Sequence, residues 1–145
     1  MKSQIIIHHA AERDRPDLNW DGIRRYHMTP EAQGGPKGGP WIDIGYNFGV
    51  ELIEEGYEIL VGRDMDIPGA HCPGHNALAF GVCFVGNFDK DEMPEAQLRA
   101  GAKFISSLMR TFIISKNNVY KHSQFNDTNC PGAKFPWDRL MELLP

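Results

Sequence analysis

The sequence is poor in cysteine, and its cysteines lie far apart. Cys72, Cys83 and Cys130 are the three cysteines among 145 residues, and no two of them form a C-x-x-C pair. An odd number of cysteines at this spacing cannot form a closed disulfide framework, which is how many small secreted domains compensate for a small core. The sequence therefore excludes a fold that is held together by disulfides.

Long apolar runs and an excess of basic charge are also absent. The apolar run at residues 5–7 is too short for the hydrophobic region of a signal peptide, and no segment approaches the roughly 20 apolar residues of a membrane span. Lys and Arg number 15 against 19 Asp and Glu, so the broad basic surface that non-specific nucleic-acid binding needs is missing. We therefore expect a protein that is cytoplasmic as synthesised and has neither a membrane nor a nucleic acid as its partner.

The composition is that of an ordinary globular protein. Hydrophobic residues make up 41% of the chain and charged residues 23%, which disfavours disorder, collagen-like repeats and coiled coil. A chain of this length usually folds as one domain, and we find no internal repeat or linker. We therefore expect one domain over residues 1–145, and a monomer.

The apolar pattern predicts strands and helices that alternate along the chain. Three consecutive isoleucines at residues 5–7 indicate a strand that is covered on both faces. Pro94 is expected at the first position of a long helix, and Asp17 is expected to cap an earlier one. The expected strands are 5–7, 45–50, 57–61 and 79–85, the expected helices are 19–27, 94–114 and 137–144, and the expected loops are 29–40 and 68–76. This order predicts an α/β fold in which helices flank a single mixed β-sheet.

His8, His122 and Cys130 are the residues that suggest a metal site. Side chains alternate across a strand, so His8 and its neighbour His9 point to opposite faces, and only one of them easily serves a given site. Imidazole nitrogen and thiolate are ligands that zinc prefers, and three protein ligands leave a fourth position for water. The spacing from His122 to Cys130 is not that of a zinc finger, so the residues alone leave a zinc site and structural histidines both open.

Four segments of the sequence, which include His8, His122 and Cys130, resemble the motifs of a known protein family. They are IIIHHA at 5–10, WIDIGYNF at 41–48, GVCFVGNF at 81–88, and KHS at 121–123 together with TNCPG at 128–132. In this order they resemble the zinc-dependent N-acetylmuramoyl-L-alanine amidases, a family related to phage lysozyme-type amidases and to peptidoglycan recognition proteins. The resemblance extends over nearly the whole chain and implies the single-domain amidase fold.

The resemblance implies a Zn²⁺ site formed by His8, His122 and Cys130. Tyr46 matches the family tyrosine whose hydroxyl assists the developing oxyanion or the transfer of protons. Thr128 lies two residues before Cys130, where some phage members carry lysine and many amidase-active recognition proteins carry threonine. A neutral hydroxyl at this position can donate one hydrogen bond but supplies no cation.

Other polar residues have a functional and a structural interpretation. His71 and Asn76 lie in the segment GAHCPGHN at 69–76, which resembles the family loop that borders the substrate groove. They are expected to contact the glycan or the stem peptide, and the alternative is a turn with solvated polar tips. His9 is expected to pack or to form hydrogen bonds on the opposite face of its strand. The four glutamates between residues 51 and 58 fit a solvated hairpin edge better than a second metal site.

The resemblance implies an enzyme that hydrolyses the amide bond between N-acetylmuramic acid and L-alanine, with peptidoglycan or a muropeptide as its partner. Cys130 argues against a catalytically silent binding module, because the cysteine is commonly replaced in family members that only bind peptidoglycan. The motifs offer no obvious fourth ligand, which argues against a structural zinc domain. The expected setting is a compact phage-type endolysin that acts on the cell wall after release, with a bacterial wall-recycling or effector amidase as the alternative.

Overall fold

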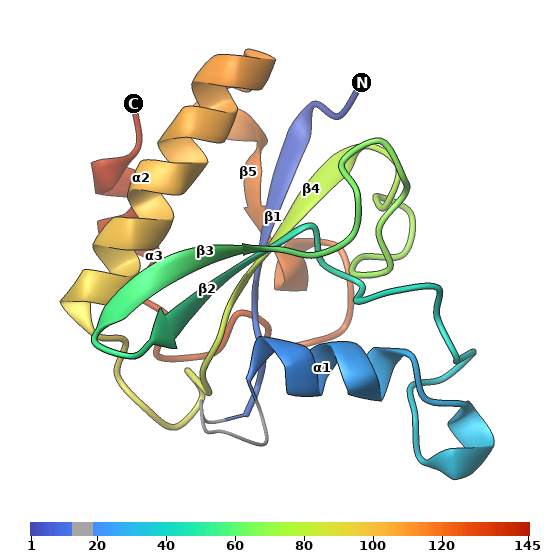
Figure 1. The fold of residues 1–145 in the computed structure, drawn as a ribbon. Helices are drawn as coiled ribbons and strands as arrows, with labels where there is room; N and C mark the ends of the chain where they lie inside the picture. Colours follow the sequence, from blue (N-terminus) through green and yellow to red (C-terminus); the bar gives the residue numbers. More distant parts are fainter. Residues whose placement is uncertain (13–18) are drawn as a thin grey trace.

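The computed structural model describes residues 1–12 and 19–145 and contains one five-stranded sheet in the order β3-β2-β4-β1-β5 (Figure 1). The strands are β1 (Gln4–His9), β2 (Phe48–Ile53), β3 (Gly56–Val61), β4 (Ala79–Phe84) and β5 (Val119–Lys121). β1 pairs in parallel with β4 and β5, β2 is parallel to β4, and β2 and β3 form an antiparallel hairpin. The predicted α/β class, with a mixed sheet flanked by helices, is confirmed.

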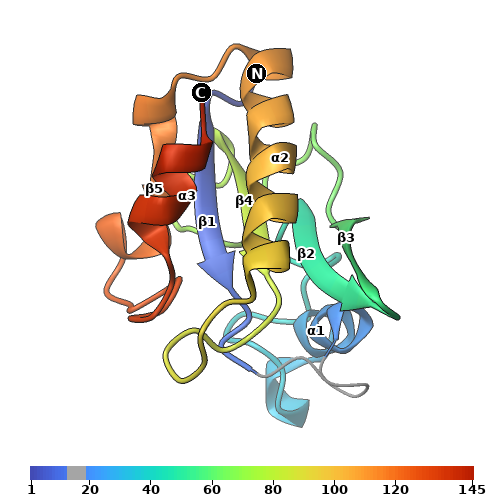
Figure 2. The same cartoon turned by 90° about the vertical axis from the view of Figure 1, so that its left-hand side faces the viewer.

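Two helices cover one face of the sheet. α2 (Glu95–Phe112) and α3 (Trp137–Leu143) lie in front of the central strands in Figure 2. Their apolar side chains pack against Ile5 and Ile7 of β1 in the main hydrophobic core. The odd-numbered positions of β1 therefore point toward these helices. Within the described ranges, no helix has the length and apolar character needed to cross a bilayer.

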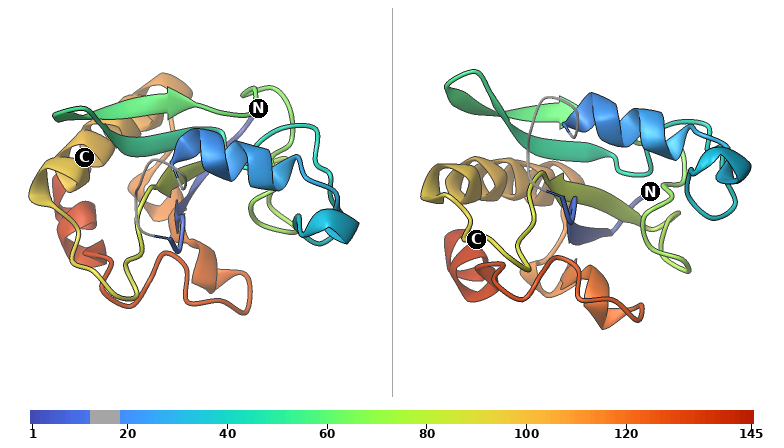
Figure 3. Two further views of the ribbon diagram at one scale, coloured as in Figure 1. Left: turned by 60° about the horizontal axis from the view of Figure 1, so that its bottom comes forward. Right: turned by 90° about the horizontal axis from the view of Figure 1, so that it is seen from below.

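α1 (Trp20–His27) lies on the other side of the sheet, apart from α2 and α3, and covers part of that face (Figure 3). Trp20 of α1 packs with Ile44, Cys83 and Val85 in a second apolar cluster. Ile6 belongs to a third, small cluster, which is separate from the main core. Because Ile6 and His8 occupy alternate positions with Ile7 between them, His8 shares the face that is opposite α2.

The structure moves several predicted boundaries. The N-cap of α1 is Asn19, whose side chain accepts a hydrogen bond from the Gly22 N–H at 3.0 Å, whereas the predicted cap, Asp17, lies outside the described residues. Pro94 is the N-cap of α2 rather than its first helical residue, because its backbone is extended with ψ near 136°. β2 begins at Phe48 instead of residue 45, so Tyr46 lies in the segment before the strand.

β5 is not among the predicted strands. It has three residues, which is too short for an alternating pattern to be recognised, and it forms because β1 supplies a parallel partner from Ile5 to Ile7. Three short 3₁₀ helices complete the described elements: η1 (Glu31–Gln33), η2 (Lys116–Asn118) and η3 (His122–Gln124). The position of β5 matters for the site, because η3 follows it directly.

Candidate metal centre

His8, His122 and Cys130 come together beside the carboxyl end of β1. Their possible ligand atoms all lie within 4.8 Å of one another. The Cys130 Sγ atom is 3.6 Å from His8 Nδ1, and the centroids of the two imidazole rings are 4.5 Å apart. The structure therefore brings the three predicted ligands into one group.

The sheet explains why residues so distant in sequence meet here. β1 and β5 are parallel neighbours, so His8 at the end of β1 and His122 directly after β5 reach the same edge of the sheet. The loop that carries Cys130 is tied back to η3 by a hydrogen bond from the Ser123 N–H to the Cys130 carbonyl at 2.9 Å. Topology, and not sequence spacing, sets the geometry of the group.

The electrostatics of the group match the needs of a soft divalent cation. Burial and the neighbouring imidazoles hold the pKa of His8 well below 6.5, and burial also lowers the pKa of His122, so both rings are neutral. Burial raises the pKa of the Cys130 thiol to about 12, so this thiol keeps its proton until a cation binds. A thiol that coordinates zinc is deprotonated outright, which couples metal binding to proton release. Two neutral imidazoles and one thiol that can lose its proton are a donor set suited to zinc.

The outer nitrogens of both imidazoles are occupied. His8 Nε2 lies 3.0 Å from His71 Nδ1, and His122 Nε2 lies 2.9 Å from the side-chain oxygen of Asn126. Sequence reasoning missed Asn126 as a member of this site. Its position four residues after His122 was the available signal, because a turn closed by a hydrogen bond from the Asn126 N–H to the His122 carbonyl at 3.2 Å brings the two residues together.

Tyr46 lies against the group, with its ring centroid 5.1 Å from that of His8. Its backbone is held on both sides: the Arg63 N–H donates to the Tyr46 carbonyl at 2.9 Å, and the Gly45 N–H donates to His27 Nδ1 at 3.0 Å. Burial, the nearby thiols of Cys83 and Cys130, and a hydrogen bond with Cys83 raise the pKa of Tyr46 well above 10. Tyr46 is therefore a neutral phenol that can donate a hydrogen bond.

Thr128 supports the cysteine through the main chain. Its hydroxyl oxygen accepts a hydrogen bond from the Cys130 N–H at 3.2 Å, which leaves the hydroxyl hydrogen free to donate elsewhere. The residue also lines a hollow of about 320 Å³ with Lys121 and Ser123. The predicted catalytic role of Thr128 remains a prediction.

His71 and Asn76 occupy inward positions in their loop. His71 is 6% exposed, and its pKa is lowered to about 3, first by burial and then by the charge of Lys2. The Asn76 side-chain oxygen accepts hydrogen bonds from the backbone N–H groups of His71 at 2.8 Å and Cys72 at 2.9 Å. The alternative of solvated polar tips is therefore wrong for His71, while the substrate contacts of both residues remain predictions.

His9 has the structural role that alternation predicts. Its Nδ1 accepts a hydrogen bond from the Phe88 N–H at 3.1 Å, and its ring stacks near that of Phe88 in the region of the main core. Two adjacent histidines thus belong to different faces of the sheet, and one of them, His8, joins the metal group. The interpretation of His9 as a packing and hydrogen-bonding residue is confirmed.

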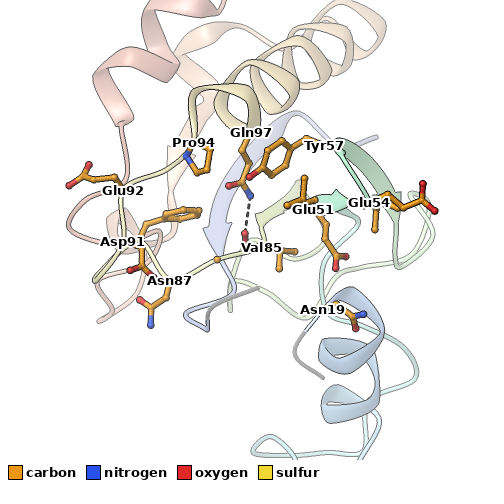
Figure 4. A pocket seen from close by; sticks show the side chains of 14 residues that line it. Asn19, Glu51, Glu54, Tyr57, Val85, Asn87, Asp91, Glu92, Pro94 and Gln97 are labelled. Carbon is orange, nitrogen blue, oxygen red and sulfur yellow. Dashed lines mark hydrogen bonds between the residues drawn. The ribbon is translucent and has the colours of Figure 1, made fainter. Parts of the chain in front are cut away.

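A cavity of about 690 Å³ lies elsewhere, between the start of α1, the β2–β3 hairpin and the segment that leads into α2 (Figure 4). The Gln97 side chain closes one wall by donating hydrogen bonds to the carbonyls of Val85 and Val50 at 2.8 and 3.0 Å. Glu51 lines this cavity, is 3% exposed and accepts a hydrogen bond from the Trp20 N–H. The prediction of a solvated glutamate edge is therefore wrong for Glu51, because its buried carboxylate binds the first backbone N–H of α1.

Comparison with known proteins gives a consistent result. Residues 2–133 match the family described as N-acetylmuramoyl-L-alanine amidase. The chain is 31% identical over 144 residues to peptidoglycan-recognition protein SC2 of Drosophila melanogaster, covering 95% of this chain and 72% of that protein. It is 35% identical over 148 residues to the endolysin of Enterobacteria phage K11, covering 98% and 89%. The solved structure of N-acetylmuramoyl-L-alanine amidase LysC from Clostridium intestinale URNW superposes with a TM-score of 0.78 at 27% identity, covering 97% of this chain and 83% of that one.

Proposed function

The chain belongs to the N-acetylmuramoyl-L-alanine amidase family, as its four motifs predicted, and we propose that it hydrolyses the amide bond between N-acetylmuramic acid and L-alanine of peptidoglycan with one zinc ion. The observation that carries this proposal is the convergence of His8, His122 and Cys130 within 4.8 Å. The endolysin and recognition-protein relatives support cleavage or binding of peptidoglycan as the broader function.

In the proposed mechanism each residue has a distinct task. His8, His122 and Cys130 would hold the ion, and three protein ligands would leave a place for water or substrate. A bound zinc ion supplies hydroxide near neutral pH and polarises the amide carbonyl. The Tyr46 hydroxyl donates a hydrogen bond to the carbonyl oxygen as negative charge develops there, and its raised pKa keeps the donor proton in place. Thr128 fixes the main chain of Cys130.

The donor set also favours an enzyme over the two alternatives. A structural zinc site needs four protein ligands, and the metal group found among the described residues contains three. A silent recognition module does not require the thiol, which is present here as a buried Cys130 beside His8. The match to 89% of the K11 endolysin supports a phage-type endolysin. In our proposal the enzyme is cytoplasmic as synthesised and acts on the wall after release. A bacterial wall-recycling or effector amidase would use the same chemistry.

The bond that is cleaved can be tested by analysis of the digestion products. Digestion of purified peptidoglycan is expected to release new L-alanine amino termini without new reducing sugar ends. Mass spectrometry of the fragments checks this. A glycosidase would need two carboxyl groups across the sugar bond, and the predicted site offers a metal group instead. New reducing ends without new amino termini would show a lysozyme-like glycosidase and contradict the proposal.

The zinc requirement can be tested with two adjacent histidines. We expect about one zinc per chain in the parent protein and in His9→Asn, and little zinc in His8→Asn. The two variants make the same change one residue apart, and the asparagine oxygen at position 9 can replace the Nδ1 atom that accepts from the Phe88 N–H. Elemental analysis checks this. A metal-replete parent without zinc, or equal zinc in both variants, would contradict the site.

A further inference from the structure

The loop before β4 lies directly behind both imidazoles of the metal group. His71 contacts His8 through a pair of ring nitrogens 3.0 Å apart, with the two rings nearly perpendicular at 84°. The next residue, Cys72, points its thiol at the side-chain oxygen of Asn126 at 3.3 Å, and that oxygen also contacts His122. One short loop therefore supports the two histidine ligands from behind.

The hydrogen-bonding state of His122 follows from the contacts of Asn126. The Asn126 amide nitrogen donates to the Phe125 carbonyl at 2.9 Å, so the amide oxygen is the atom that faces His122 Nε2. An amide oxygen can only accept, so Nε2 must carry the hydrogen. In a neutral ring this leaves Nδ1 with its lone pair, which is the form that a metal ion requires.

The same reasoning applies to His8. Its Nδ1 faces the Cys130 Sγ atom at 3.6 Å, whereas its Nε2 faces His71 Nδ1. A lone pair on Nδ1 requires the hydrogen on Nε2, and that hydrogen then has His71 Nδ1 as its acceptor. An imidazole that binds a metal commonly donates its second N–H in this way, which fixes the ring orientation and the tautomer.

The ring of His71 is held too firmly to be a mobile surface group. A Cβ atom on Gly81 would lie 2.6 Å from the His71 ring, and one on Gly69 would also collide with it, so two glycines form the slot for this imidazole. The Asn76 side-chain oxygen accepts hydrogen bonds from the backbone N–H groups of His71 and Cys72. The Lys2 ammonium donates to the Asn76 carbonyl at 3.0 Å and so anchors the loop to the N-terminal segment.

We propose that His71 and Asn126 are positioning residues that keep His8 and His122 in the Nε2-protonated tautomer, so that each ligand presents Nδ1 to a common ion. The proposal rests on the proposed zinc function of the site. His71 thereby acts on the metal through His8, and Asn126 acts through His122. Loss of either acceptor leaves a buried N–H without a partner and permits the ring to change tautomer or turn away.

A matched pair of substitutions at position 71 tests the hydrogen bond separately from packing. Asparagine and leucine have the same branched shape, and both remove the ring volume from the glycine slot, but only asparagine keeps an acceptor near the Nδ1 position. Zinc affinity, measured by chelator competition, is expected to fall about 10–100-fold in His71→Leu and to stay near the parent value in His71→Asn. Asn126→Leu is expected to weaken zinc binding to a similar degree.

A second measurement reads the tautomer without any metal. The ¹⁵N chemical shifts of the His8 ring in the metal-free protein are expected to show Nε2–H in the parent and in His71→Asn, and a mixture of tautomers in His71→Leu. Equal zinc affinity and equal His8 shifts in the two variants would overturn the proposal and make His71 a packing residue. A parent protein that binds no zinc would overturn the proposed function as well, so the two failures can be distinguished.

Discussion

Cys130→Ser is expected to remove most of the turnover while leaving muropeptide affinity nearly unchanged. Serine at neutral pH does not replace a thiolate as a zinc ligand, so the site would lose one of the three groups proposed to hold the ion. The expected fall in kcat exceeds the roughly 10²–10³-fold cost of removing a single oxyanion donor, because both the metal-activated nucleophile and the polarised carbonyl are lost. We expect binding to survive, because a glycan with its stem peptide is much larger than the space around the three ligands. Single-turnover kinetics and calorimetric titration with a muropeptide separate the two effects.

Cys72→Ser is the matched control for this experiment. Both thiols are buried, so the two substitutions place a similar polar group in the interior. A serine hydroxyl at position 72 can still donate to the side-chain oxygen of Asn126, as the thiol does at 3.3 Å. Zinc content and turnover should therefore remain close to those of the parent. A Cys130→Ser enzyme as active as the parent would rule out the metal mechanism, and a zinc-loaded parent that binds muropeptide without cleaving it would indicate a recognition module.

The spacing of apolar residues along the chain was enough to predict β1 and α2. Three consecutive isoleucines identified β1 as a strand covered on both faces, and the structure places helices on one face and α1 with loops on the other. The alternation of side chains along a strand assigns His8 and His9 to opposite faces, and their contacts differ accordingly. Amphipathic spacing likewise identified α2 within a few residues of its ends.

The meeting of the ligands could not be predicted from the residues alone. His8 and Cys130 are 122 positions apart, and their contact depends on the pairing of β1 with the three-residue β5, which carries no recognisable pattern. The family resemblance supplied this information instead of the spacing. The burial of His71 and Glu51 had no local signal either, because each depends on a partner from a distant segment, His8 in one case and Trp20 in the other.

Tyr46→Phe is expected to lower kcat by about 10²–10³-fold, the usual cost of losing one oxyanion donor that acts in the transition state. The centroids of the Tyr46 and His8 rings are 5.1 Å apart. Phenylalanine keeps this ring in place and removes only the hydroxyl. The phenol is the stronger candidate donor because burial and the neighbouring thiols raise its pKa well above 10, so its proton is present across the working pH range. Zinc content should be unchanged, since Tyr46 is not among the three ligands.

Comparison of Thr128→Val with Tyr46→Phe shows which hydroxyl stabilises the oxyanion. Valine has the shape of threonine without the hydroxyl, and the Thr128 oxygen already accepts the Cys130 N–H at 3.2 Å. We expect a smaller fall in kcat than for Tyr46→Phe, because the proposed zinc ion would polarise the same carbonyl and the lost contact acts chiefly on the main chain of Cys130. Steady-state rates on peptidoglycan, measured alongside zinc content, check both variants. If Tyr46→Phe turns over at the parent rate while Thr128→Val does not, Tyr46 is a packing residue and the threonine hydroxyl, with zinc, stabilises the tetrahedral intermediate.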